Sequence, residues 1–161
     1  MSYAPDYPFA KLDYGETLEV APGIFWVRMP LPFALNHINL WLLADGDELT
    51  IVDTGYNVDR SRDIWDDVLR KIVGSRPIKR VICTHFHPDH MGLAGWFEER
   101  FDAPLWMTYT EWLQAHVAVS ETLTHNFDRW LEFYTDNGAP TEMTVGFKAV
   151  SYTHLTLPTK A

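Results

Sequence analysis

The first half of the chain is a series of short apolar runs separated by turn residues. LEVAPGIFWVRMP, residues 18–30, predicts two short strands that break at Pro22-Gly23. INLWLLADGDELTIVDTG, residues 38–55, predicts a hairpin that turns at Asp45-Gly46-Asp47, between two apolar runs. The stretch up to about Gly15 is rich in Pro, Tyr and Asp, and we expect it to be a surface arm.

Over residues 59–73 the apolar positions change to helical spacing, and Gly74 stands where the helix would stop. The positions that carry this spacing are Ile64, Val68, Leu69, Ile72 and Val73. VIC at 81–83 predicts a short buried strand, followed by a helix over 92–101 and a strand over 104–107. Strand, helix and strand in this order place the residues after Cys83 just beyond the C-terminal end of a strand, where functional groups commonly collect.

The chain changes character after Met107 and is predicted to be mainly helical from 110 to 149. One helix is indicated by an apolar face at i, i+3, i+4 and i+7, formed by Phe127, Trp130, Leu131 and Tyr134. Asn137-Gly138 and Pro140 separate this helix from a final one.

Composition and charge narrow the classes of partner. A chain of 161 residues with 47% hydrophobic residues is sufficient for one small globular domain. A net charge of −9 provides no basic face for nucleic acid, so we expect a small-molecule substrate. No secretion signal and no long apolar run is present, which predicts a cytoplasmic protein without a membrane partner. The sequence leaves the oligomeric state open.

The main candidate for chemistry is THFHPDH, which follows the strand predicted at 81–83. In extended backbone His85 and His87 project to the same side, so both imidazoles can bind one ion while Phe86 points into the core. Asp89 and His90 come after a turn at Pro88 and can bind a second ion nearby. Imidazole and carboxylate together suit zinc, iron or manganese, and two such ions can share a hydroxide that attacks an electrophile.

THFHPDH resembles the signature of the metallo-β-lactamase fold superfamily, and IVDTG at 51–55 is similar to that family's earlier strand-end motif. The opening strands and LPFALNHINLWLL add to the resemblance, which extends over most of residues 18–107. Within the family the sequence is most similar to hydrolases of the glyoxalase II kind. A histidine directly after Asp89 is unlike lactam hydrolases of the commonest subclass.

The resemblance implies an αβ/βα sandwich with His85 and His87 on one zinc ion and Asp89 and His90 on a second. Asp89 would also be catalytic, because as a ligand it helps to orient the attacking hydroxide. Asp53 would orient the metal-binding loop by hydrogen bonds, although a plain strand-end Asx turn is the alternative interpretation. The implied reaction is hydrolysis of a thioester, a lactone or a similar carbonyl compound.

Two rival functions stay open. A persulfide dioxygenase uses a similar histidine-rich motif around a single iron, which places the chain in another reaction class. Alternatively the chain as written is an incomplete domain without turnover, because the family takes further ligands from its second half and none can be assigned here. His116 and His125 lie in predicted helices without the family's ligand loop, so we give them no role.

The chain is therefore predicted to be the N-terminal half of a metallo-β-lactamase fold plus a helical segment, over residues 1–149. VSYTHLTLPT, which begins at Val150, resembles an in-frame translation of a sequencing-library adapter, so 150–161 is predicted to be a non-native tail. A genuine β-like tail is the alternative.

Other residues have structural explanations. The single cysteine, Cys83, excludes an internal disulfide and is expected to be a small buried side chain, although its strand parity matches that of His85. Asn36 and His37 resemble a family position at the rim of the site and are kept out of the catalytic set. The tryptophans could line a substrate channel, but core packing is the simpler interpretation for Trp96, Trp106, Trp112 and Trp130.

Overall fold

The computed structural model describes residues 8–72, 74, 76–119 and 132–140. The strands are β1 (Thr17–Ala21), β2 (Ile24–Pro30), β3 (His37–Asp45), β4 (Glu48–Val52), β5 (Ile78–Ile82) and β6 (Leu105–Trp106). The helices are α1 (Asp59–Ile72), α2 (Pro88–Met91), α3 (Ala94–Phe101) and α4 (Tyr109–Val119). Within the described residues, no helix has the length and apolar character that crossing a membrane requires.

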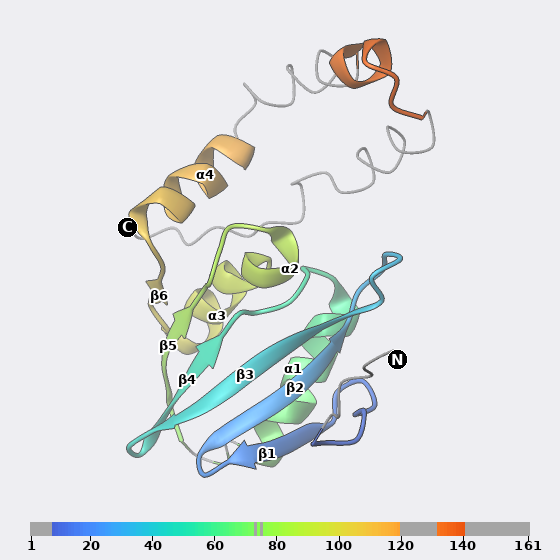
Figure 1. Ribbon diagram of the computed structural model, residues 1–161. Coiled ribbons are helices and arrows are strands. Elements are labelled where there is room, and N and C mark those ends of the chain that lie inside the picture. The colour runs from blue at the N-terminus through green and yellow to red at the C-terminus, as the bar shows by residue number, and fades with distance from the viewer. Residues whose placement is uncertain (1–7, 73, 75, 120–131, 141–161) are drawn as a thin grey trace.

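The strands form one six-stranded mixed sheet in the order β1-β2-β3-β4-β5-β6 (Figure 1). The first four strands pair antiparallel, whereas β4, β5 and β6 pair parallel. Both predicted turns are confirmed, and each is made by a glycine with positive φ, Gly23 at +74° and Gly46 at +67°. The parallel pairing of β4 with β5 requires a crossover, which α1 supplies.

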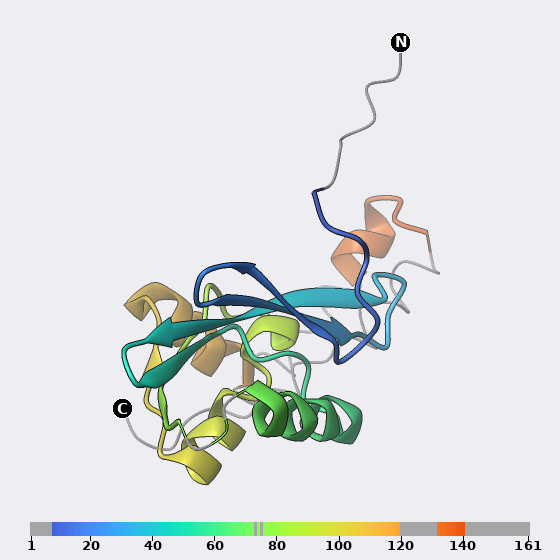
Figure 2. The ribbon, with the colours of Figure 1, turned by 90° about the horizontal axis from the view of Figure 1, so that it is seen from below.

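Helices α1 and α3 cover the same face of the sheet and enclose the core (Figure 2). As predicted, Val68 and Leu69 of α1 are buried. The largest buried side chain on α1 is Trp65, which the apolar spacing did not single out. Its ring meets Phe97 of α3 edge to face, with the ring centroids 5.2 Å apart. This aromatic pair joins the two helices over the sheet.

The opposite face of the sheet carries a continuous apolar row. Neighbouring strands pair side chains across all six strands, and the row consists of Leu18, Trp26, Trp41, Val52, Ile82 and Trp106. The first five are partly buried and Trp106 is 54% exposed. Each row member alternates along its strand with residues of the core face, because successive side chains point to opposite faces.

Several predicted boundaries differ from the structure. The strand predicted at 81–83 runs from Ile78 to Ile82, and Cys83 follows it. The helix predicted over 92–101 begins two residues later, at Ala94, as α3, and a separate short helix, α2, precedes it. Three of the four members of the predicted helical face lie outside the described residues, as do the final helix and the tail at 150–161. The domain boundary at 149 therefore stays a prediction.

Gly92 lies where two segments of backbone come very close together. A Cβ at this position would lie 2.8 Å from the carbonyl oxygen of Gly55 and 2.9 Å from the amide nitrogen of Asn57, and it would also strike the carbonyl oxygen of Pro88. These atoms belong to the backbone and cannot rotate aside. Only glycine therefore allows the turn after α2 to pack on the segment that follows β4.

We predict that Gly92→Ala lowers the free energy of unfolding by about 3 kcal/mol, because the backbone must shift to admit the methyl group. Urea denaturation measures the change. Gly74→Ala is the matched control: Gly74 has positive φ, but a Cβ added there would meet no atom within 4 Å. It should lose only about 1 kcal/mol, the cost of left-handed backbone. Equal losses would contradict the close-packing argument.

Candidate metal centre

The candidate site lies at the edge of the sheet where β4 and β5 end. These two strands are parallel neighbours, so their carboxyl ends meet at the same edge. Asp53 and Thr54 follow β4, and the segment 84–90, called the histidine loop below, follows β5. The amide of Asp53 donates to the carbonyl of Ile82 at 2.8 Å, which extends the pairing of the two strands up to the site.

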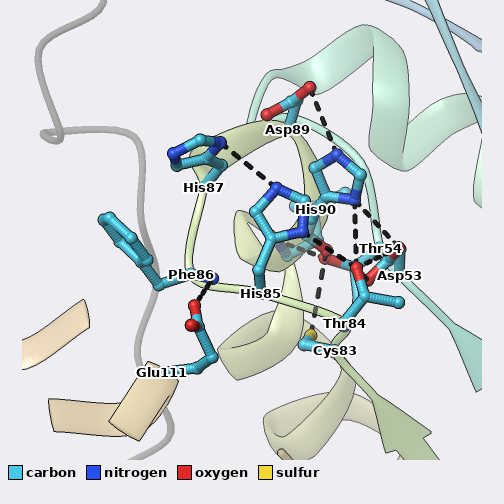
Figure 3. A network of polar contacts seen from close by, with 11 residues as sticks. Asp53, Thr54, Cys83, Thr84, His85, Phe86, His87, Asp89, His90 and Glu111 are labelled. Carbon is cyan, nitrogen blue, oxygen red and sulfur yellow. Dashed lines mark hydrogen bonds and ion pairs between the residues drawn. The ribbon is translucent and has the colours of Figure 1, made fainter. Parts of the chain in front are cut away.

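The carboxylate of Asp53 binds the histidine loop at two points (Figure 3). Its Oδ1 accepts the backbone N–H of Thr84 at 2.8 Å, and its Oδ2 accepts the Thr84 hydroxyl at 2.9 Å and Nδ1–H of His90 at 2.8 Å. These partners are 31 and 37 residues away along the chain, so an Asx turn does not account for them. Asp53 is only 5% exposed and has a left-handed backbone, with φ of +59°.

His90 is held at its backbone as well as at its ring. Its carbonyl oxygen accepts the amide of Thr54 at 2.7 Å and the Thr54 hydroxyl at 2.9 Å, and the thiol of Cys83 lies 3.8 Å away. The same hydroxyl accepts the amide of Leu93 at 3.0 Å. With Nδ1–H donated to Asp53, the Nε2 atom of His90 keeps its lone pair and is available to bind an ion.

His85 and His87 lie on the same side of the histidine loop. Nε2 of His85 is 3.2 Å from Nδ1 of His87, and the His85 ring also lies against the His90 ring, with centroids 3.8 Å apart. Nδ1 of His85 is 3.0 Å from the Thr84 hydroxyl. The ring of Phe86 points away from the His85 and His90 rings (Figure 3), packs against the core and meets the His87 ring edge to face, with centroids 4.9 Å apart. The backbone at 84–86 is bent and not the extended chain that the sequence predicted.

A second pair of donor atoms comes from the short helix α2. Nε2 of His90 lies 3.7 Å from Oδ2 of Asp89. Both side chains are partly buried, with 22% of each side chain exposed. The sequence-predicted residues His85, His87, Asp89 and His90 therefore lie together at one edge of the sheet, with Asp53 behind them.

The donor atoms suit metal ions in two pairs. Nitrogen ligands about 2.0–2.1 Å from a tetrahedral zinc ion lie about 3.3 Å from each other. The His85 and His87 nitrogens, 3.2 Å apart, match this separation. Among the described residues, no group of three or more His, Cys, Asp or Glu side chains is arranged to hold one ion. The residues fit the imidazole and carboxylate chemistry of such a centre, but each pair alone is an incomplete set of ligands.

Two pKa shifts bear on which groups can bind an ion. Burial, and then the neighbouring His90 and His87, lower the pKa of His85 below its usual value, which favours the neutral imidazole that a metal requires. Burial, and then the charge of Asp53, raise the pKa of the Cys83 thiol well above its usual value. Cys83 is only 3% exposed, so it is the small buried side chain that we expected and not a thiolate ligand.

The residues that we left out of the site lie elsewhere or have local partners. Nδ1 of His37 contacts the side-chain oxygen of Asn36 at 2.8 Å. Nδ1 of His116 is 2.9 Å from the carbonyl oxygen of Trp112, one turn earlier in α4. His125 and Trp130 lie outside the described residues. Trp96 is partly buried against the core, which agrees with core packing, whereas Trp106 is mostly exposed.

Sequence reasoning missed three residues that support the histidine loop. Thr54 ties β4 to α2, Thr84 contacts Asp53, and the carboxylate of Glu111 in α4 accepts the amide of Phe86 at 2.9 Å. Thr54 lies within DTG and Thr84 begins THFHPDH. Their positions next to Asp53 and His85 could have identified them as residues that support the site. For Glu111, only Thr108-x-x-Glu111 was visible, a pattern that indicates a helix start.

We predict that Asp53→Asn weakens zinc binding at least tenfold, because an amide has no charge and cannot accept from both Thr84 and His90 with the geometry of the carboxylate. Asparagine tolerates left-handed backbone, so the substitution adds little strain. Isothermal titration calorimetry gives the affinity. Asp45→Asn is the control, since Asp45 pairs with Lys79 and Arg80 away from the site. Unchanged affinity in Asp53→Asn would show that Asp53 does not orient the ligands.

We predict that Thr54→Val lowers the free energy of unfolding by about 1–3 kcal/mol, because the buried amide of Leu93 loses its acceptor and the His90 carbonyl loses a donor. Valine matches the shape of threonine, so little cavity is created. Thr110→Val, at an exposed position of α4, should change stability by less than about 0.5 kcal/mol. Equal denaturation midpoints for Thr54→Val and the unsubstituted chain would refute the assigned role.

Two curated relatives match parts of the chain. The "Probable metallo-hydrolase YqjP" of Bacillus subtilis (strain 168) is 32% identical over 77 residues, which are 47% of this chain and 24% of that protein. The "Linear primary-alkylsulfatase" of Pseudomonas sp. (strain ATCC 19151) is 54% identical over 43 residues, 27% of this chain and 8% of that protein.

Two solved structures share the fold. A beta-lactamase domain protein from Burkholderia ambifaria has a TM-score of 0.65 and 43% identity, covering 74% of this chain and 41% of that one. A metallo-beta-lactamase family protein from Thermus thermophilus has a TM-score of 0.67 and 27% identity, covering 87% of this chain and 46% of that one. The chain thus spans less than half the length of the proteins that it matches.

These likenesses confirm the predicted fold class, of which the described residues form one mixed sheet with its helices. The family model for the metallo-beta-lactamase superfamily matches residues 35–155, well over half of the chain, and the curated relative YqjP is described as a metallo-hydrolase. The matched range includes Asp53 and the histidine loop. The chain belongs to the metallo-beta-lactamase superfamily.

Proposed function

We propose that the chain carries the metal-binding core of a hydrolase that uses two zinc ions to cleave a thioester, a lactone or a similar carbonyl compound. The observation that supports this most is the pairing of donors at one sheet edge. His85 contacts His87 through ring nitrogens, and Asp89 lies beside Nε2 of His90. The resemblance to hydrolases of the glyoxalase II kind favours these carbonyl substrates over lactams.

Each residue has a distinct task in this proposal. His85 and His87 would hold one ion, and Asp89 and His90 the other. When bound, such ions would supply an activated water and a positive charge for the substrate oxygen. Asp89 would orient the attacking water, while Asp53 keeps the His90 ring in the tautomer whose Nε2 is free of a proton.

A protein nucleophile is not needed in this scheme. Cys83 is the only cysteine in the sequence, and its buried thiol has a raised pKa and faces the carbonyl of His90. The chain's charge of −9 favours a small-molecule substrate over nucleic acid. We further propose a cytoplasmic location, because a single cysteine that can form no internal disulfide suits a reducing compartment.

A second candidate substrate is a sulfate ester. The match to the alkylsulfatase is short, but its 54% identity is the highest among the relatives described above. Hydrolysis of a sulfate ester would use the same kind of metal-activated water, and the same four side chains would hold the ions. Direct comparison of the two substrate classes can therefore decide between them.

We predict that His85→Ala/His87→Ala abolishes binding of the first zinc ion, because two of its ligands are lost together. Zinc content after dialysis, measured by inductively coupled plasma mass spectrometry, checks this. His116→Ala is the matched control, because the His116 ring nitrogen contacts its own helix. Zinc retained in full by the double variant would contradict the proposed ligands.

Activity assays then separate the proposed functions. In the full-length natural protein, zinc-dependent release of a thiol, a hydroxy acid or sulfate identifies a thioesterase, a lactonase or a sulfatase. A single bound iron with oxygen uptake would instead indicate a persulfide dioxygenase. The 161-residue chain itself is expected to show no turnover. Thioester hydrolysis by this chain that disappears in the double variant would contradict that expectation.

A further inference from the structure

Helix α4 docks on the rest of the molecule through small side chains. Glu111, Ala115 and Ala118 lie at i, i+4 and i+7, so they share one face of the helix. Ala115 is fully buried and belongs to the hydrophobic core, and Ala118 is 6% exposed. The exposed Leu113 and Val117 lie on another face. Glu111 therefore stands at the head of the docked face, where a carboxylate has no role in apolar packing.

The carboxylate of Glu111 reaches the histidine loop. Its Oε2 accepts the backbone N–H of Phe86 at 2.9 Å (Figure 3), and Phe86 lies between His85 and His87. None of the ion pairs found among the described residues involves Glu111. The contact with Phe86 is thus the charged interaction that the structure assigns to this side chain.

The local sequence predicts a different use for this carboxylate. Thr108-x-x-Glu111 is a capping box, in which the glutamate normally accepts the N–H of the N-cap residue. The first half of the box is present, because the Glu111 amide donates to the Thr108 hydroxyl at 3.4 Å. The carboxylate, however, accepts from a residue 25 positions away. The glutamate of this capping pattern therefore makes a tertiary contact with the histidine loop instead of capping its own helix.

The position of this hydrogen bond determines its consequence. The ring of Phe86 packs against the core, and its N–H is held by Glu111, so the peptide between His85 and His87 is fixed on both sides. Rotation of that peptide would turn the two imidazoles apart.

We propose that Glu111 is a positioning residue of the histidine loop, which holds His85 and His87 in register for one metal ion. Its effect on metal affinity rests on the proposed function, whereas its effect on the loop does not. The competing explanation is that Glu111 only stabilises the first turn of α4 through the helix dipole. The positioning role requires the length of the side chain, whereas the helix-end role requires its negative charge.

Two conservative variants separate these explanations. Glu111→Asp keeps the charge at the helix start but shortens the side chain, so it should lose the bond to Phe86. Glu111→Gln loses the charge but keeps an oxygen at the right distance, so it should retain the bond. A positioning role predicts damage from aspartate and rescue by glutamine, and a helix-end role predicts the reverse. Glu99→Asp, at an exposed position of α3, is the matched control.

The first readout is hydrogen exchange at the Phe86 amide in the metal-free protein, followed by NMR. We expect exchange to be about tenfold faster in Glu111→Asp and close to the unsubstituted rate in Glu111→Gln and Glu99→Asp. The second readout is cobalt titration followed by the visible absorption of the bound ion. The cobalt dissociation constant should rise about tenfold in Glu111→Asp, with an altered spectrum, and stay within about threefold in Glu111→Gln.

The results distinguish failure of the positioning role from failure of the proposed metal centre. Unchanged Phe86 exchange in Glu111→Asp, or equal damage in both variants, would overturn the positioning role. If the unsubstituted chain binds no cobalt, the proposed metal centre fails, and the exchange rates alone then decide whether Glu111 orders the loop. Faster exchange and weaker cobalt binding in Glu111→Asp, with both restored by glutamine, would support the proposal in full.

Discussion

The site depends on the buried carboxylate of Asp53. A charge at this depth is costly unless it is well hydrogen-bonded, and the donors that satisfy Asp53 come from the histidine loop, through Thr84 and His90. The same bonds offset the strain of its left-handed backbone. The loop therefore folds onto Asp53 because the carboxylate requires it, and the orientation of the His90 ring is a consequence of that requirement.

The same region is also a junction of the core. The indole of Trp65 in α1 donates to the carbonyl of Thr54 at 2.6 Å, and its ring packs on Phe97 of α3. Thr54 in turn holds the carbonyl of His90 and the amide of Leu93. Helix α1, the end of β4 and the start of α3 thus meet around one threonine. Core packing and the geometry of the candidate ligands therefore depend on the same contacts, and a change in either should affect the other.

The sequence predicted those features that depend on neighbouring residues. The turn at Gly46 follows from local backbone rules, and the structure contains it. His85 and His87 also share a side, although the backbone at 84–86 is bent and not extended as predicted. The burial of Trp65 and the partner of Glu111 were not predictable, because each depends on a contact with a distant segment. A pattern such as Thr108-x-x-Glu111 indicates where a helix begins but carries no information on what the helix will dock against.

The same limit explains the boundary errors. The helix predicted over 92–101 begins only at Ala94, because sequence spacing does not reveal that Gly92 must pass close to the backbone of Gly55 and Asn57. Gly92 and Leu93 separate α2 from α3. The break also leaves Asp89 and His90 on their own short helix at the edge of the sheet. A misplaced boundary in the prediction was thus caused by the packing that presents two of the candidate ligands.

Two features of the described residues lack part of what they need: an apolar surface that is not fully buried, and sets of metal ligands that are not full. One is the apolar row that crosses the sheet from Leu18 to Trp106 on the face opposite α1 and α3, with its members only partly buried. The other is the set of donors, which form pairs where a zinc ion takes four ligands. Both lie on one sheet, and β4 and β5 contribute to both. Val52 and Ile82 of the row are the last residues of β4 and β5, so the row reaches the edge of the sheet at which the donor pairs lie.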